Sequence, residues 1–182
     1  MSIVEVVFAA SLLFIMMGVT TWLMDSGNRA YGSVSSATNL ETSAARSINR
    51  IVDLMRMASF TSVNPRPRAD LGMSTSSIQF QIADEVAPQR IRLVAGTGQL
   101  ARTRDLGTAD EMDDVWSHDV ADLLQGEEVN GVDDNGNGLV DEEGLCFTFD
   151  GNVLVVRLTV TDTGSRGETI TRTFESRVAF RQ

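Results

Sequence analysis

The sequence contains few of the residues that cross-links and catalysis need. Cys146 is the one cysteine, so a disulfide within the chain is impossible. We expect its thiol to fill a small core position beside Phe147 rather than to act as a nucleophile, because no histidine or basic residue lies near it in the sequence. His118 is the one histidine, and we expect it to be solvated beside Asp119 in a polar stretch. No glycine-rich phosphate loop, no Cys/His set with metal-ligand spacing and no nucleophile with a neighbouring base is visible, so the sequence favours a protein that is not an enzyme.

Lysine is absent, and all 15 basic residues are arginines. Against 25 acidic residues they leave a formal net charge of −10, which argues against binding of nucleic acid or anionic membranes by the whole surface. A local exception is a band of four arginines that would share one face of two adjacent strands: Arg90, Arg92, Arg102 and Arg104. We expect this arginine band to be a solvated face that pairs with nearby acids, and contact with DNA or an acidic partner is the alternative.

Charge is also absent from the first 24 residues, except at Glu5. The uncharged run Val6–Met24 would measure roughly 29 Å as a helix, close to the ~30 Å hydrocarbon thickness of a bilayer. A carboxylate within a membrane-spanning segment costs on the order of 2.5–3.5 kcal/mol, so we expect Glu5 to be functional, with an α-amino group as its partner. No arginine precedes Arg29, so the basic start of a signal peptide is missing, and a plain signal anchor would leave Glu5 unexplained.

The helix is predicted to continue to about Ser59. Small or apolar side chains recur at spacings of three, four and seven, which indicates one face packed on a sheet: Ala30, Val34, Ala37, Ala44, Ile48, Ile51, Met55 and Ala58. The first half of the helix is apolar all round, and nothing else in the chain is long enough to cover it, so only lipid or other copies of the chain can do so. The chain therefore divides into a transmembrane and polymerisation half-helix (1–24), an amphipathic half (25–60) and a globular domain (61–182).

The globular domain is predicted to be an antiparallel β domain, which gives an α+β fold with the long helix packed on the sheet. After a surface loop over Thr61–Met73, alternating apolar residues predict a three-stranded meander and, later, two longer strands: Ser77–Ile82, Arg90–Val94 and Gln99–Arg104, then Asn152–Thr161 and Thr169–Arg181. A turn at Gly164–Gly167 would join the last two. The insertion 105–144 is acidic, lacks periodicity and could hold a short helix over Asp119–Leu124, and its length suggests a functional loop or one that a ligand holds in place.

The insertion contains the beginning of a calcium-loop pattern. Oxygen-bearing side chains stand at positions 1, 3 and 5, a glycine at position 6 and a backbone carbonyl at position 7: Asp133, Asn135, Asn137, Gly138 and Leu139. The bidentate glutamate expected at position 12 is missing, since that position is Gly144, so Asp141, Glu142 or Glu143 would have to complete the shell. We expect calcium here, with an affinity on the order of 10⁻⁴–10⁻³ M. The alternative is a tight turn with solvated acids.

The N-terminal stretch resembles the mature N-terminus of type IV pilins and of the pseudopilins of type II secretion, on Met1, Glu5 and the apolar residues that follow. The resemblance implies that a prepilin peptidase removes a short basic leader, that residue 1 is N-methylated, and that Glu5 neutralises the N-terminal amine of Met1 on a neighbouring subunit during assembly. Trp22 stands where many major pilins carry a proline, and Met1 stands in place of the commoner phenylalanine. The layout is most similar to that of J-type minor pseudopilins and W-type minor pilins, on the segments Arg46–Ala58, Ile78–Arg104 and Arg172–Arg181.

This resemblance implies a structural subunit of a pilus-like extracellular filament that assembles through its helix and serves adhesion, motility, uptake or secretion. The alternatives are a minor pseudopilin that initiates or tips a secretion pseudopilus, and a single-pass membrane module that responds to calcium. The expected partners are copies of the chain or other pilins, the prepilin peptidase and the assembly platform, and not nucleic acid. The expected location is the inner membrane before assembly, and an extracellular filament or periplasmic pseudopilus afterwards.

Overall fold

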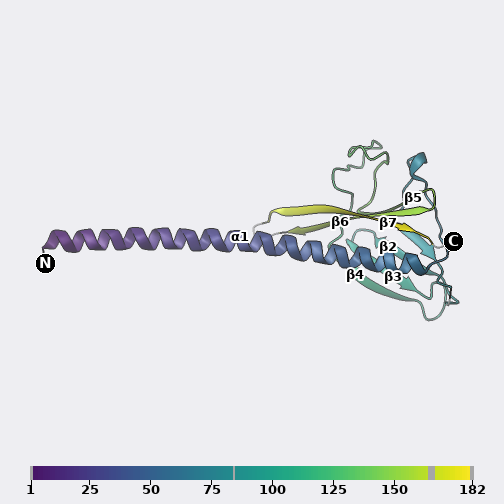
Figure 1. The fold of residues 1–182 in the computed structure, drawn as a ribbon, viewed down its shortest axis with the longest axis horizontal. Helices are drawn as coiled ribbons and strands as arrows, with labels where there is room; N and C mark the ends of the chain where they lie inside the picture. Colours follow the sequence, from purple (N-terminus) through teal and green to yellow (C-terminus); the bar gives the residue numbers. More distant parts are fainter. Residues whose placement is uncertain (1, 84, 164–166, 181–182) are drawn as a thin grey trace.

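A computed structural model describes residues 2–83, 85–163 and 167–180. Its largest element is α1 (Ile3–Met57), whose 55 residues rise about 82 Å. The N-terminal half of α1 extends alone, away from the rest of the chain, and the C-terminal half packs against β-strands (Figure 1). The helix ends two residues before the predicted Ser59, because Ala58 adopts an extended backbone and pairs with Ile82.

The first sheet has four antiparallel strands in the order β1-β2-β3-β4, with the bounds β1 (Ser77–Phe80), β2 (Gln89–Val94), β3 (Gln99–Arg104) and β4 (Met112–Ser117). The predicted meander is confirmed for its three strands, although β1 is two residues shorter than predicted. The sequence did not predict β4, which lies inside the expected insertion. Its acidic residues Asp113 and Asp114 obscure the strand pattern, because they pair with Arg92 of β2 and Arg104 of β3 where apolar residues would be expected.

The second sheet is antiparallel in the order β5-β6-β7, with the bounds β5 (Leu145–Asp150), β6 (Val153–Thr163) and β7 (Thr169–Ala179). The two predicted long strands are confirmed as β6 and β7. The predicted turn Gly164–Gly167 and the predicted strand end Arg181 fall on or next to residues 164–166 and 181–182, outside the described residues. Strand β5 was missed because its first five residues are all buried, so it shows no alternation of polar and apolar residues.

The core lies between α1 and the two sheets, which confirms the α+β arrangement. From α1 it takes Leu40, Ala44, Ile48, Ile51, Val52, Leu54 and Met55. The predicted stripe is confirmed from Ala44 to Ala58 but not near its beginning, where Ala30 is exposed and Val34 is 64% exposed. The difference arises because Leu40 is the first residue of α1 that the sheets bury.

The remaining connections are extended or short 3₁₀ turns. Two such turns, η1 (Phe60–Ser62) and η2 (Ala69–Leu71), lie in the predicted loop after the helix. The short helix considered for Asp119–Leu124 is wrong. This segment lies flat along β6, where the Ala121 amide donates to the Thr159 carbonyl at 3.0 Å, and these contacts between distant segments replace a local helix.

Removal of a buried side chain from the packed half of α1 should destabilise the whole domain. Ile51 is fully buried against the sheets, so we expect Ile51→Ala to lower the free energy of unfolding by about 2–5 kcal/mol through the cavity it leaves. Met57→Ala is the matched control, because Met57 is 53% exposed on the same helix and should change stability by less than about 1 kcal/mol. Chemical unfolding of the full chain in detergent measures both, and equal effects would contradict this packing.

Candidate functional site

The N-terminal half of α1 carries an uninterrupted apolar surface that the chain leaves exposed. Its most apolar 18-residue window has a mean hydropathy of 2.3, and none of that window is buried. Large side chains such as Phe8, Phe14 and Trp22 are 69%, 73% and 67% exposed. Among the described residues, α1 is the one helix that is long and apolar enough to cross a membrane.

Glu5 caps its own helix. The Ser2 amide donates to Glu5 Oε2 at 2.9 Å, and the Ser2 hydroxyl accepts from the Val4 amide at 3.4 Å. This is a capping box, in which two side chains satisfy amides that the first helical turn leaves without partners. The Ser-x-x-Glu spacing of Ser2 and Glu5 already carried that signal in the sequence. Met1, the expected assembly partner of Glu5, lies outside the described residues.

The acidic loop, which comprises residues 133–143, curls around the carboxylate of Asp133. Its Oδ1 accepts from the amides of Gly136 at 2.6 Å and Asn137 at 3.1 Å, and its Oδ2 accepts from the Gly138 amide at 2.8 Å. Asn135 Oδ1 also accepts from the Asn137 amide, at 3.0 Å. The predicted curl over positions 1 to 6 is therefore present, and backbone amides rather than side chains hold the first carboxylate.

Leu139 fixes the loop to the domain. Its side chain is 2% exposed and packs with Leu124 and Cys146 in a small apolar cluster of its own. Burial also raises the pKa of the Cys146 thiol to about 11, so the thiol stays protonated at neutral pH and fills the core position expected of it. Leu139 thus seats the loop against Cys146 of β5, and Figure 1 shows the loop projecting from the face of the second sheet opposite α1.

The three carboxylates proposed to complete the calcium shell occupy different surroundings. Asp141 accepts from the amides of Asn130 and Gly131 at 2.9 and 3.0 Å, so it closes a turn. Glu143 is exposed. Glu142 is fully buried, and its Oε1 accepts from Asn137 Nδ2 at 2.6 Å.

A second buried carboxylate, Glu127, lies against the same loop. It is 7% exposed, and its Oε1 accepts from the Asn135 amide at 3.1 Å. Burial and the charge of Glu127 raise the pKa of the Glu142 carboxyl above its usual range. Sequence reasoning missed Glu127, because it precedes the motif by six residues and only the fold brings it to Asn135.

No group of three or more His, Cys, Asp or Glu side chains within the described ranges is arranged to hold a metal ion as it stands. Asp133, Asp141 and Glu142 are each held by a different partner: Asp133 by amides of the loop, Asp141 by the Asn130 amide and Glu142 by Asn137. The arrangement instead pairs two carboxylates, Glu127 and Glu142, beside the neutral oxygens of the loop.

Gly144 explains why the loop lacks a glutamate at position 12. A Cβ added to Gly144 would lie 1.8 Å from the carbonyl oxygen of Ala121, a distance that no side chain can occupy. Two hydrogen bonds fix this close approach, from the Gly144 amide to the Asp122 carbonyl at 2.9 Å and from the Thr159 amide to the Gly144 carbonyl at 2.7 Å. Packing against Ala121 therefore allows only glycine at position 144.

The predicted arginine band on one face does not form. The register pairs Arg90 with Thr103 and Ile91 with Arg102, so Arg90 and Arg92 lie on one face of the sheet and Arg102 and Arg104 lie on the other. Two of these arginines pair with acids of β4, as expected. Arg92 NH2 lies 2.7 Å from Asp113 Oδ2, and Arg104 Nε lies 2.9 Å from Asp114 Oδ2. Arg102 Nε donates to Gln89 Oε1 at 2.8 Å. One arginine on each face of the sheet is therefore paired with an acid of β4.

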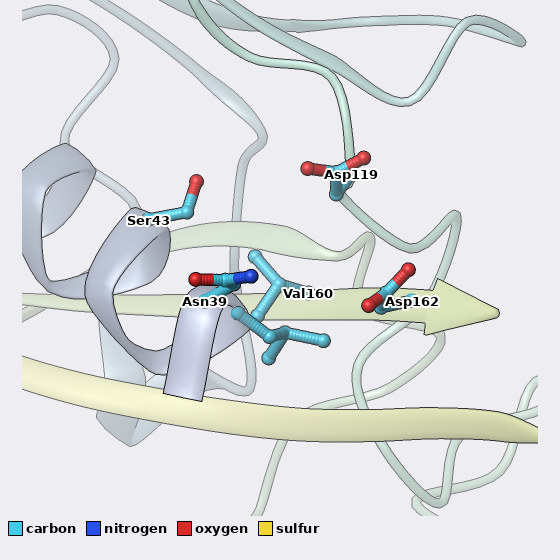
Figure 2. A pocket seen from close by; sticks show the side chains of 6 residues that line it. Asn39, Ser43, Asp119, Val160 and Asp162 are labelled. Carbon is cyan, nitrogen blue, oxygen red and sulfur yellow. The ribbon is translucent and has the colours of Figure 1, made fainter. Parts of the chain in front are cut away.

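A cavity of about 210 Å³ lies between α1 and β6. Asn39 and Ser43 line it from the helix, Asp162 from β6, and Asp119 from the extended segment beyond (Figure 2). Both carboxylates in this cavity are at least partly exposed to solvent. It is a small recess of mixed polar and apolar lining beside the helix, and not a site with assembled chemistry.

Comparisons of the chain with known protein families, with curated proteins and with solved structures found no match.

Gly144→Ala should test the packing that shapes the acidic loop. We expect it to lower the free energy of unfolding on the order of 3 kcal/mol, because the segment at Ala121 must move away from the new methyl group. Gly27→Ala is the control. Nothing lies within 4 Å of its added Cβ on the exposed helix, so this change should be neutral or stabilising by up to ~1 kcal/mol. Thermal unfolding of the full chain in detergent measures both, and a neutral Gly144→Ala would contradict the close approach.

Proposed function

We propose that this protein is a structural subunit of a pilus-like filament that assembles through the N-terminal half of α1. The observation that carries the proposal is the exposed apolar surface of that half-helix. Fifteen large apolar side chains between Ile3 and Met24 are 48–83% exposed, and each would contribute about 1.5–3 kcal/mol when fully buried. A surface of this size requires lipid or other helices around it.

A filament explains both environments that this surface needs. Before assembly the half-helix would lie in the inner membrane as a single pass, and the domain would lie outside the bilayer. After assembly the same side chains would pack against those of neighbouring subunits in the filament core. The partners would then be copies of the chain or other pilins, with a prepilin peptidase and an assembly platform upstream. A pilus subunit would dominate purified filaments, whereas a minor subunit at the tip of a secretion pseudopilus would be present in few copies.

Glu5 has a different task in each state. In the isolated chain its carboxylate accepts from the Ser2 amide and caps the helix. In a packed filament core a carboxylate near the end of an apolar helix would need a positive partner, because an unpaired buried charge is strongly disfavoured. The N-terminal amine of a neighbouring subunit would supply that charge.

Substitutions at Glu5 can separate the charge from the cap. Glutamine at this position preserves a capping box, so Glu5→Gln removes the charge alone, and Glu5→Ala removes both. We expect both variants to insert into membranes at least as well as the wild type and to give few or no filaments. Ser2→Ala is the control, since it weakens the cap by ~1 kcal/mol and keeps the charge, and it should assemble normally. Membrane fractionation and electron microscopy of sheared filaments provide the readouts, and a wild-type filament yield from Glu5→Gln would refute the role of the charge.

We also propose that the acidic loop binds calcium as a structural ion. Support comes from the curled loop over positions 1 to 6, from the neutral oxygens of Asn135 and the Leu139 backbone, and from buried carboxylates beside them. Calcium accepts such mixed oxygen sets with flexible geometry. The ion would hold the projecting loop in one conformation and would have no catalytic role.

Calcium should raise the unfolding temperature of the full chain. With a dissociation constant of about 10⁻⁴–10⁻³ M, 10 mM free calcium, at roughly 10–100 times that constant, would stabilise the folded chain by about 1.4–2.7 kcal/mol. For a chain of this size, that stabilisation corresponds to a shift of roughly 3–10 °C. Thermal unfolding in detergent, with calcium and with a chelator, measures the shift, and identical curves would sink the calcium proposal.

A further inference from the structure

We propose that Glu127 and Glu142 are the two carboxylates that bind calcium in the acidic loop, an inference that rests on the calcium proposal above. Glu142 lies within the loop motif, whereas Glu127 comes from the turn before it. Together they would take the place of the glutamate that the packing at Gly144 excludes.

Each of the two glutamates is anchored by one oxygen and has a second oxygen without a partner. Glu127 Oε1 accepts from the Asn135 amide, and Glu142 Oε1 accepts from Asn137 Nδ2. Within the described part of the chain, Glu127 Oε2 and Glu142 Oε2 are buried and accept no hydrogen bond. Glu127 and Glu142 are only 7% and 0% exposed, so bulk water does not replace the hydrogen bonds that these two oxygens lack. A bound cation would give both of these buried carboxylate oxygens the partner that they lack.

The anchors place both carboxylates against the metal-binding positions of the loop. Glu127 is held at position 3 and Glu142 at position 5. Their backbones are joined as well, because the Glu127 amide donates to the Leu124 carbonyl and the Leu124 amide donates to the Glu142 carbonyl, each at 3.0 Å.

The other predicted carboxylate ligands of the loop either already accept hydrogen bonds from backbone amides or are exposed to solvent. Asp133 accepts from three backbone amides, and Asp141 accepts from the amides that close the turn at Asn130. Glu143 is exposed to solvent. The choice left open by the sequence, among Asp141, Glu142 and Glu143, therefore falls on Glu142.

The charge and the chemistry of this pair suit calcium. Two carboxylates neutralise one divalent cation, and amide and carbonyl oxygens of the loop can complete a shell of hard oxygen ligands. The ion would also cross-link two segments, the turn at Leu124–Glu127 and the loop 133–139. Removal of calcium would leave two like charges buried together, so it should loosen this part of the domain first.

The test is a calcium titration of the full chain in detergent, by calorimetry, on the wild type, Glu127→Gln and Glu142→Gln. We expect each substitution to weaken calcium binding by at least about tenfold. Even mutations of residues that only hydrogen-bond to metal ligands cost about 10–100-fold in metal affinity. In the presence of a chelator each variant should be at least as stable as the wild type, because glutamine removes one of two buried like charges. A role in packing alone predicts the opposite pattern, with lower stability in chelator and unchanged calcium affinity.

Glu143→Gln is the matched control, because it removes the same charge from the adjacent, exposed residue and should bind calcium like the wild type. Magnesium in place of calcium should give weaker binding, since it demands a more regular shell. If the wild type binds no calcium, the calcium proposal fails together with this inference. If the wild type binds calcium and either glutamine variant binds as tightly, calcium in the loop stands and the assignment to this pair is overturned.

Discussion

The structure depends on one constraint: half of a continuous 55-residue helix has an apolar surface that its own chain does not cover. The domain buries α1 only from Leu40 onward, and the sheets contribute nothing to the residues before Met24. Burial of apolar area is the dominant favourable term in folding and association, so this half-helix would gain stability in lipid or among other helices. A membrane before assembly and the proposed filament afterwards are the two environments that would cover this surface.

The periodic parts of the fold could be predicted from the sequence. The long helix, its buried stripe from Ala44 to Ala58, the three-stranded meander and the strands β6 and β7 all follow from apolar spacing of 3.6 or 2. Strand β4 could not be found in this way, because Asp113 and Asp114 pair with arginines of β2 and β3 and interrupt its apolar pattern. Strand β5 could not be predicted for the opposite reason: both of its faces are buried, so its polar and apolar residues do not alternate. The extended course of Asp119–Leu124 is set by pairing with β6, a contact that no local pattern encodes.

The candidate site could be predicted only in part from the sequence. The motif predicted the curl of the loop around Asp133, because alternate oxygens and Gly138 favour that turn. It did not predict that Asp141 would bond to backbone amides, or that Glu127 would reach Asn135 from six residues before the motif. Such contacts depend on how the loop is seated on the domain. Leu139 determines that seating through its burial with Leu124 and Cys146, so an apolar residue in an acidic motif positions the charges around it.

The unbroken course of α1 also separates the domain from a bilayer electrically. From Met24 to Leu40, the first residue that the sheets bury, the helix rises about 24 Å. Electrostatic interactions between exposed charges are screened over ~8 Å at physiological ionic strength. With the apolar half-helix in a membrane, the domain core would lie roughly three screening lengths beyond it. A chain with a formal charge of −10 could therefore stand on an anionic membrane surface with little repulsion, because the same helix that holds it there also keeps it at a distance.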